Sequence, residues 1–153
     1  MNAEILKLEN QLCFPLYAAA KAMVKKYTPF LESIKLTYTQ YITMMVMWEQ
    51  KTISVKDLGK HLYLDSGTLT PLLKRLEGKK LISRTRGING DERLVYVSVT
   101  PKGAALKTKA LRVPQEMGKC LSLDPQEAHA LYTLLYKLLG RLEGPEDQGG
   151  QQE

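Results

Sequence analysis

Two short helices are predicted close together in the middle of the chain, and their spacing constrains the fold more than any other feature. The first begins at the Ser54 and Asp57 pair of "SVKDLGKHLY", a helix-start signal, and is expected to end near Leu62. A second helix is predicted within a few residues, in "LDSGTLTPLLKRLEGKKL". Its leucines fall at i, i+3, i+4 and i+7 and are expected to face inward: Leu69, Leu72, Leu73 and Leu76. Two short helices joined by a tight turn indicate a helix-turn-helix.

A β-hairpin is predicted directly after this helix pair. Beyond Gly78 the apolar period changes from helical spacing to alternation, in "LISRTR" (81–86) and "ERLVYVSVT" (92–100). The connection contains Asn89-Gly90, a strong signal for a hairpin turn. The expected fold class is therefore mainly α with a small β-hairpin wing, a winged helix-turn-helix.

Helices are also predicted before the helix pair. Residues 5–33 show helical apolar spacing, interrupted by Pro15. Either Asn10 caps a helix that begins there, so that the proline falls in the first turn, or the helix kinks. Thr37 and Gln40 then form a capping box that opens a buried helix over about 38–49.

The chain after the hairpin is predicted to return to helix. Residues 101–120 have helical character with an interruption near Pro114, and Asp124 caps a final helix with Pro125 and Glu127 in its first turn. That helix carries a long leucine stripe, which this small fold has too few elements to cover. We expect the first and last helices to bury their apolar faces against a second copy, in a two-fold dimer.

The domain plan follows from these elements. Residues 1–142 are expected to form one domain, with dimerisation helices over about 5–33 and 102–142 and a nucleic-acid-binding part over about 37–100. The Gly/Pro/Gln/Glu-rich tail, 143–153, is expected to be disordered.

The charge distribution favours a polyanionic partner. The chain has 22 basic and 16 acidic residues, and four of the acids lie in the tail from Glu143. The segment 74–112 holds half of the bases. The chain has no apolar export segment and no apolar run long enough to span a bilayer, so we expect a cytoplasmic protein with no membrane partner. The motifs and Cys/His spacings suggest neither a metal site nor a cofactor.

One face of the second helix suits contact with DNA. Five side chains point away from the leucines on a helical wheel: Gly67, Thr70, Pro71, Lys74 and Arg75. An ordinary solvated helix face would look the same. The hairpin adds a basic prong of Arg84, Arg86 and Arg93 with flanking Lys79 and Lys80, and Asp91 is placed to hold the Arg93 guanidinium.

These residues carry a resemblance to a known family. "LYLDSGTLTPLLKRLE" and "DERLVYVSVTPKG" resemble the recognition helix and wing of the MarR (multiple antibiotic resistance regulator) family. Six positions match its D-x-R-x-x-x-V-x-V/L-T-x-x-G signature: Asp91, Arg93, Val97, Val99, Thr100 and Gly103. The resemblance implies a homodimeric repressor of a palindromic DNA operator, with base or phosphate contacts from Ser66, Thr68, Thr70 and the wing-tip Arg93.

Cys13 is the second candidate site. A cysteine on an apolar helix face is most often an inert buried thiol. If the helix begins near Asn10, however, the positive end of the helix dipole lies beside the sulfur and favours the thiolate, the form that peroxides attack. Tyr17 lies one turn away, and Tyr27 lies about 21 Å along the axis, so Tyr27 would reach the sulfur only from a second subunit.

Here "LENQLCFPLYAAAKAMVKKYTPFL" and "LTYTQYITMMVMWE" resemble the organic-hydroperoxide-sensing branch of the MarR family. The resemblance implies that organic hydroperoxide oxidises Cys13, and that Tyr17 and Tyr27 form hydrogen bonds to it across the dimer. Cys120 is either the partner of Cys13 in an intersubunit disulfide or a spectator, in which case a small thiol caps oxidised Cys13.

Two other functions remain open at this point. A MarR-type regulator could respond to a small phenolic ligand, with Cys13 incidental. A thiol peroxidase would use the same cysteine as an enzyme, but a chain with a nucleic-acid-binding half and no evident reductant site favours a regulator that is not an enzyme.

Overall fold

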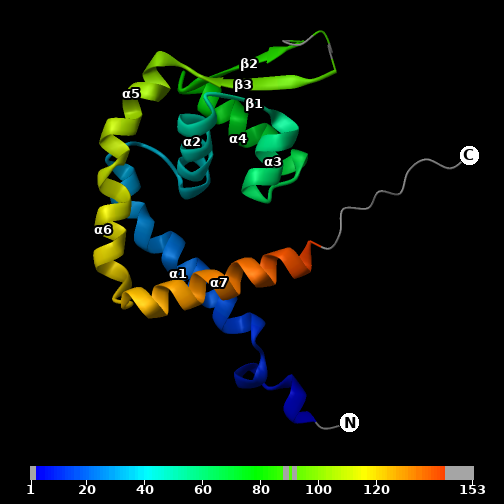
Figure 1. The fold of residues 1–153 in the computed structure, drawn as a ribbon, viewed down its shortest axis with the longest axis vertical. Coiled ribbons are helices and arrows are strands. Elements are labelled where there is room, and N and C mark those ends of the chain that lie inside the picture. The colour runs from blue at the N-terminus through cyan, green and yellow to red at the C-terminus, as the bar shows by residue number, and fades with distance from the viewer. Residues whose placement is uncertain (1–2, 88–89, 91–92, 144–153) are drawn as a thin grey trace, which may run out of the picture. The chain divides into compact units, whose positions relative to one another are not determined.

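The computed structural model describes residues 3–87, 90 and 93–143 of the 153-residue chain. The chain divides into two compact units, with the boundary between Met117 and Gly118. The first unit contains most of the helices and all of the strands in the described residues, and the second contains the end of one helix and the last helix (Figure 1).

The first long helix, α1 (Cys13–Glu32), begins later than the sequence indicated. Two short 3-10 helices precede it, Ala3–Leu6 and Leu8–Asn10. Asn10 is not its cap, because the Asn10 side chain donates to the Glu4 carbonyl at 2.8 Å, and the N-cap is Leu12, which makes no side-chain capping bond. Pro15 therefore lies in the first turn, where its missing N–H is harmless, and no kink is needed.

The predicted helix starts in the middle of the chain are confirmed. Thr37 Oγ1 accepts from the Gln40 amide at 3.3 Å, and Gln40 Oε1 accepts from the Thr37 amide at 3.2 Å, so the capping box opens α2 (Tyr38–Gln50). Ser54 Oγ accepts from the Asp57 amide at 3.0 Å and caps α3 (Val55–Leu62). After a short turn α4 (Ser66–Gly78) completes the helix-turn-helix.

The core of the first unit confirms the predicted inward face of α4. Its four leucines are all buried, and they pack with Met44 and Met47 of α2 and Leu58 of α3. The five residues predicted to face outward are all exposed. The amphipathic pattern therefore fixed which face of α4 is presented to solvent.

Three antiparallel strands lie side by side next to α2, α3 and α4 (Figure 1). The predicted hairpin pairs β2 (Ile82–Arg86) with β3 (Val95–Val99). Gly90 has φ +85°, as hairpin turns require, while Asn89 lies outside the described residues. A strand that the sequence did not predict, β1 (Thr52–Ser54), pairs with the other edge of β3, so the order is β1-β3-β2.

The base of the wing is closely packed against α5 (Pro101–Ala110). A Cβ added to Gly103 would lie 2.1 Å from the Leu81 carbonyl oxygen, so only glycine fits at this position. Trp48 Nε1 donates to the Gly103 carbonyl at 2.8 Å, and Thr100 Oγ1 caps α5 by accepting from the Gly103 amide at 3.0 Å. Three parts of the unit thus meet at Gly103: α2, the wing base and α5.

The predicted interruption near Pro114 lies one turn earlier than the proline. α5 ends at Ala110 and α6 (Arg112–Leu121) begins after Leu111. A proline clashes with the carbonyl four residues before it and removes the bond to that carbonyl, which here belongs to Ala110. The helix therefore breaks at Leu111, and Pro114 lies in the first turn of the new helix.

The second unit contains α7 (Pro125–Leu142), which begins as predicted. Asp124 Oδ1 accepts from the Glu127 amide at 2.9 Å, and Glu127 Oε2 accepts from the Asp124 amide at 3.0 Å. No residue of α7 is buried. The predicted disordered tail lies outside the described residues from position 144 onward. Among the described residues, no helix is long and apolar enough to cross a membrane.

Candidate functional site

The exposed face of α4 is rich in hydroxyl groups at its N-terminal end. Asp65 Oδ1 accepts from the Thr68 amide at 2.8 Å and caps the helix. This bond and weaker ones nearby lower the pKa of the Asp65 carboxyl, so the cap stays charged. Thr70 Oγ1 donates to the Ser66 carbonyl at 2.8 Å. The side chains of Ser66, Thr68 and Thr70 are all exposed, as expected for groups that meet a ligand.

The same face becomes basic farther along the helix. Lys74 and Arg75 are exposed and lie one to two turns after the hydroxyl groups. Small and hydroxyl-bearing residues followed by cations suit a helix that enters a major groove, because hydroxyl groups can reach base edges and cations can reach phosphates.

The three wing arginines have different surroundings. Arg84 is half-buried and bound to Glu77 of α4: its Nη2 and Nε donate to Glu77 Oε2 at 2.7 and 3.0 Å. The Arg84 backbone amide also donates to Glu77 Oε1 at 3.2 Å. These hydrogen bonds lower the pKa of the Glu77 carboxyl. Arg86 and Arg93 are exposed, and Asp91 lies outside the described residues, so its pairing with Arg93 stays a prediction.

Lys79 does not belong to the basic prong to which the sequence assigned it. Its ammonium group donates to the Lys35 carbonyl at 2.5 Å and to Gln40 Oε1 at 2.9 Å. Burial lowers the pKa of Lys79. This lysine joins the end of α4 to the α1–α2 connection, whereas Lys80 is exposed.

The thiol of Cys13 is exposed in the single chain and belongs to the first residue of α1. This placement confirms that the cysteine lies in the opening turn, beside amide groups that have no acceptor within the helix. Tyr17, one turn later, is also exposed, and the Lys21 ammonium lies 5.3 Å from its ring centroid.

Tyr27 lies near the other end of α1 and packs on α2. Its ring centroid is 4.8 Å from that of Tyr38 and 6.1 Å from that of Tyr41. Burial, and to a smaller extent the neighbouring Tyr38, raise the pKa of Tyr27. The phenol is therefore protonated at neutral pH and available as a hydrogen-bond donor. Fourteen residues of helix, about 21 Å, separate it from Cys13 of the same chain.

The second cysteine is also exposed. Cys120 lies in the last turn of α6, in the second unit. Its exposure leaves both sequence interpretations open, because an accessible thiol fits a disulfide partner as well as a spectator.

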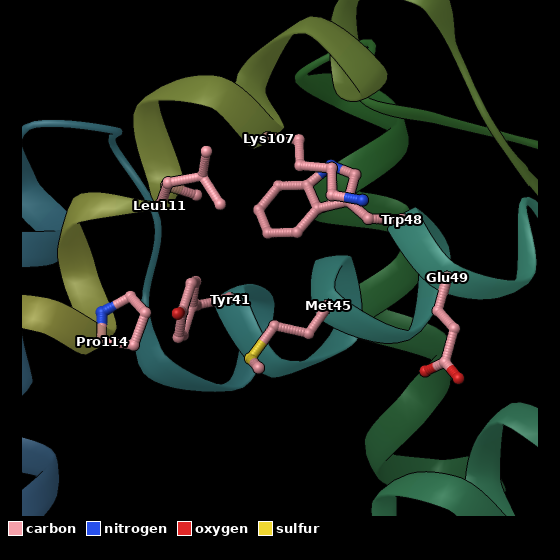
Figure 2. Close-up of a pocket in the computed structure, with 8 residues that line it drawn as sticks. Tyr41, Met45, Trp48, Glu49, Lys107, Leu111 and Pro114 are labelled. Carbon is pink, nitrogen blue, oxygen red and sulfur yellow. The ribbon is translucent and has the colours of Figure 1, made fainter.

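A pocket of about 290 Å³ opens between α2 and the α5–α6 segment. Figure 2 shows Tyr41, Met45 and Trp48 on one side and Leu111 and Pro114 on the other. The remaining lining residues are Glu49, Lys107 and Ala110. An apolar pocket with one cation and one carboxylate at its border suits an amphipathic small molecule.

The fold and the exposed hydroxyl and basic face of α4 define a winged helix-turn-helix transcriptional regulator, as the sequence predicted. The family model described as transcriptional regulator SarA/Rot matches residues 25–110. The organic hydroperoxide resistance transcriptional regulator of Bacillus subtilis is 49% identical over 140 residues, which cover 87% of this chain and 92% of the relative.

Solved structures give the same assignment. Reduced AbfR bound to DNA is 30% identical with a TM-score of 0.77, covering 94% of this chain and 97% of AbfR, a protein of Staphylococcus epidermidis. A mutant MarR from E. coli complexed with operator DNA is 27% identical with a TM-score of 0.77, covering 84% of this chain and 94% of MarR.

The chain belongs to the MarR family of transcriptional regulators, in the branch of the organic hydroperoxide resistance regulators. The predicted resemblance is thus confirmed. These relatives are regulators and not enzymes, which argues against the thiol peroxidase alternative.

Proposed function

We propose that the protein is a homodimeric repressor that binds a palindromic operator and releases it when an organic hydroperoxide oxidises Cys13. One observation carries the proposal: the exposed Cys13 opens α1 in a chain 49% identical to an organic hydroperoxide resistance regulator. The protein acts in the cytoplasm, where the operator DNA of a bacterium lies.

DNA recognition is assigned to α4 and the wing. Ser66, Thr68 and Thr70 contact base edges or phosphates, and Lys74 and Arg75 neutralise the backbone. Arg86 and Arg93 of the wing add contacts beside the groove. In a two-fold dimer the two α4 helices lie about 34 Å apart, one turn of DNA. The DNA-bound state of AbfR and of the E. coli MarR variant supports this assignment.

A second copy would cover the apolar surfaces that one chain leaves open. The first half of α1 exposes large apolar side chains, among them Phe14 at 42% and Tyr17 at 59%. In the second unit, α7 exposes Leu134 at 63% and Leu142 at 72%. Exposed apolar surfaces of this kind mark interfaces, so both helices are assigned to the dimer contact.

The sensing reaction begins at the Cys13 thiolate. The sulfur attacks the distal oxygen of the hydroperoxide, the O–O bond breaks, and the alkoxide leaves and takes up a proton. The thiol is oxidised to sulfenic acid and the hydroperoxide is reduced to an alcohol. Tyr17 and the neutral phenol of Tyr27, both contributed by the second copy, donate hydrogen bonds to the sulfur before the reaction.

Sulfenic acid alone does not supply enough free energy for release. Near-complete switching requires about 5.5 kcal/mol of differential stability. One lost charge-assisted hydrogen bond contributes about 1.5 to 3 kcal/mol. A disulfide completes the switch: a thiol, from Cys120 of the second copy or from a small molecule, condenses with the sulfenic acid and releases water.

The test compares wild type with Cys13→Ser while operator complexes are titrated with cumene hydroperoxide. Wild type is expected to release DNA and Cys13→Ser to stay bound, and equal release from both would end the redox mechanism. The matched control is Cys120→Ser: mass spectrometry after treatment then distinguishes an intersubunit disulfide from a mixed disulfide on Cys13.

The pocket favours a second candidate function, release by a small phenolic ligand. Its aromatic and apolar lining and its volume of about 290 Å³ fit such a molecule. A phenol that releases the operator equally from wild type and Cys13→Ser, without peroxide, would favour this candidate.

A further inference from the structure

We propose that Glu77 and Arg84 form a strut that sets the angle between the wing and the recognition helix α4. Arg84 is then a positioning residue and not a phosphate contact. The inference rests on the proposed operator binding, and it divides the three wing arginines into one that holds the wing and two that meet DNA.

The geometry of the strut is directional. One carboxylate oxygen of Glu77 accepts from both Nε and Nη2 of Arg84, at 3.0 and 2.7 Å. The other oxygen accepts from the Arg84 backbone amide at 3.2 Å. The carboxylate in the last turn of α4 therefore holds the side chain and the main chain of β2 at the same residue. Three donors of one residue that meet both oxygens of one carboxylate fix an orientation as well as a distance.

The position of Arg84 along β2 explains why a strut belongs there. Side chains of a strand alternate, so Ile82, Arg84 and Arg86 share one face. Ile82 is buried in the core, Arg84 is half-buried, and Arg86 is exposed. Arg84 also lies opposite Val97, whose side chain is fully buried. The strut thus stands at the edge of the core, just before the hairpin extends beyond it.

The strut is expected to favour DNA binding by holding the wing in place before DNA arrives. A two-stranded hairpin is only marginally stable by itself, and a mobile wing would lose freedom when it meets the backbone. Fixing β2 to α4 beforehand reduces this cost. A phosphate contact would instead require Arg84 to leave a carboxylate that it already binds at 2.7 Å.

The first experiment is a double-mutant cycle of Glu77→Ala and Arg84→Ala, with operator affinity measured over a range of salt concentrations. Each single variant is expected to bind about three- to tenfold more weakly, and the double variant no more weakly than either one. A change in charge alone predicts the opposite for Glu77→Ala, because removing an anion near DNA strengthens binding.

The salt dependence distinguishes positioning from contact. A lost phosphate contact reduces the slope of log affinity against log salt by about 0.9. Arg84→Ala is expected to keep the wild-type slope. The matched control is Arg86→Ala, on the same face of the same strand, which is expected to reduce the slope by about 0.9.

The charge-swapped variant E77R/R84E gives the sharpest result. It restores an ion pair with its charges reversed but not the bond to the backbone amide of residue 84, so a strut predicts recovery of part of the lost affinity. Thermal unfolding of each variant, without DNA, confirms that the helix-turn-helix remains folded.

Two outcomes would overturn the strut: a slope reduced by about 0.9 for Arg84→Ala, or a charge swap that binds more weakly than Arg84→Ala. Failure of the proposed function looks different, since wild type itself would then not bind the operator or would not release it with peroxide.

Discussion

The head of the protein, from α2 to α5, and the helices α1 and α7 use the same apolar residue types in opposite ways. In the head, Leu58 and Leu76 are completely buried within one chain. In the first half of α1 and in α7, Leu16 and Leu134 are 39% and 63% exposed. The head therefore has a hydrophobic core of its own, whereas the apolar faces of the flanking helices are left for another surface to bury.

The largest expected effect tests whether the head is stabilised within one chain. Leu76→Ala removes a fully buried side chain and leaves a cavity, so the free energy of unfolding should fall by about 2–5 kcal/mol. Urea denaturation followed by circular dichroism measures it. The loss should be the same at low and high protein concentration, and a loss that disappears at high concentration would contradict a core internal to the chain.

A smaller effect is expected where the buried surface is shared between copies. Leu134→Ala should raise the dimer dissociation constant about tenfold, because it removes apolar area that only association buries. Sedimentation velocity at several concentrations measures the change, and Lys137→Ala on the same helix is the control. An unchanged dissociation constant would remove this part of α7 from the interface.

The two capping boxes allow a matched comparison of helix starts. Thr37→Ala should lower the free energy of unfolding of the head by about 1 kcal/mol, since it removes one half of the box that opens α2. Asp124→Ala removes the corresponding cap of α7 and should increase amide exchange only in that helix. Faster exchange throughout the head in the Asp124 variant would show that the two regions are not separable in stability.

The smallest effect is a pH dependence within the head. Hydrogen bonds from Arg84 lower the pKa of the Glu77 carboxyl. The pair therefore stabilises the fold fully above the unfolded-state pKa of about 4.3. This contribution is lost as the pH falls through the folded-state pKa. Because the side chains are 30% and 38% exposed, solvent screening limits it to less than about 1 kcal/mol. The stabilities of wild type and Glu77→Gln should differ at pH 7 and converge as the pH falls through the folded-state pKa of Glu77.

Sequence signals that act over a few residues predicted most of the helices and strands of the head. Capping pairs such as Thr37 with Gln40, and the leucine spacing of α4, act within a few residues and are readable from sequence. The strand β1 was missed because three residues are too few to show the alternating apolar pattern of a strand. Its pairing with β3 also joins positions more than forty residues apart in the sequence.

At the candidate sites, the sequence predicted the exposure and position of side chains but not their partners. The exposed face of α4 and the place of Cys13 in the opening turn followed from helix geometry. The pairing of Arg84 with Glu77, and of Lys79 with Gln40, did not, because each depends on how separate elements pack. From their charge alone, Arg84 and Lys79 were both predicted to belong to the basic prong of the wing.

Trp48 is the single tryptophan of the chain, and its indole donates to the carbonyl of Gly103 at the root of the wing. Its fluorescence therefore comes from one known location, where α2 and α5 join. A spectrum recorded during exposure to peroxide or operator would follow that joint directly, so the molecule contains its own optical probe and needs no added dye.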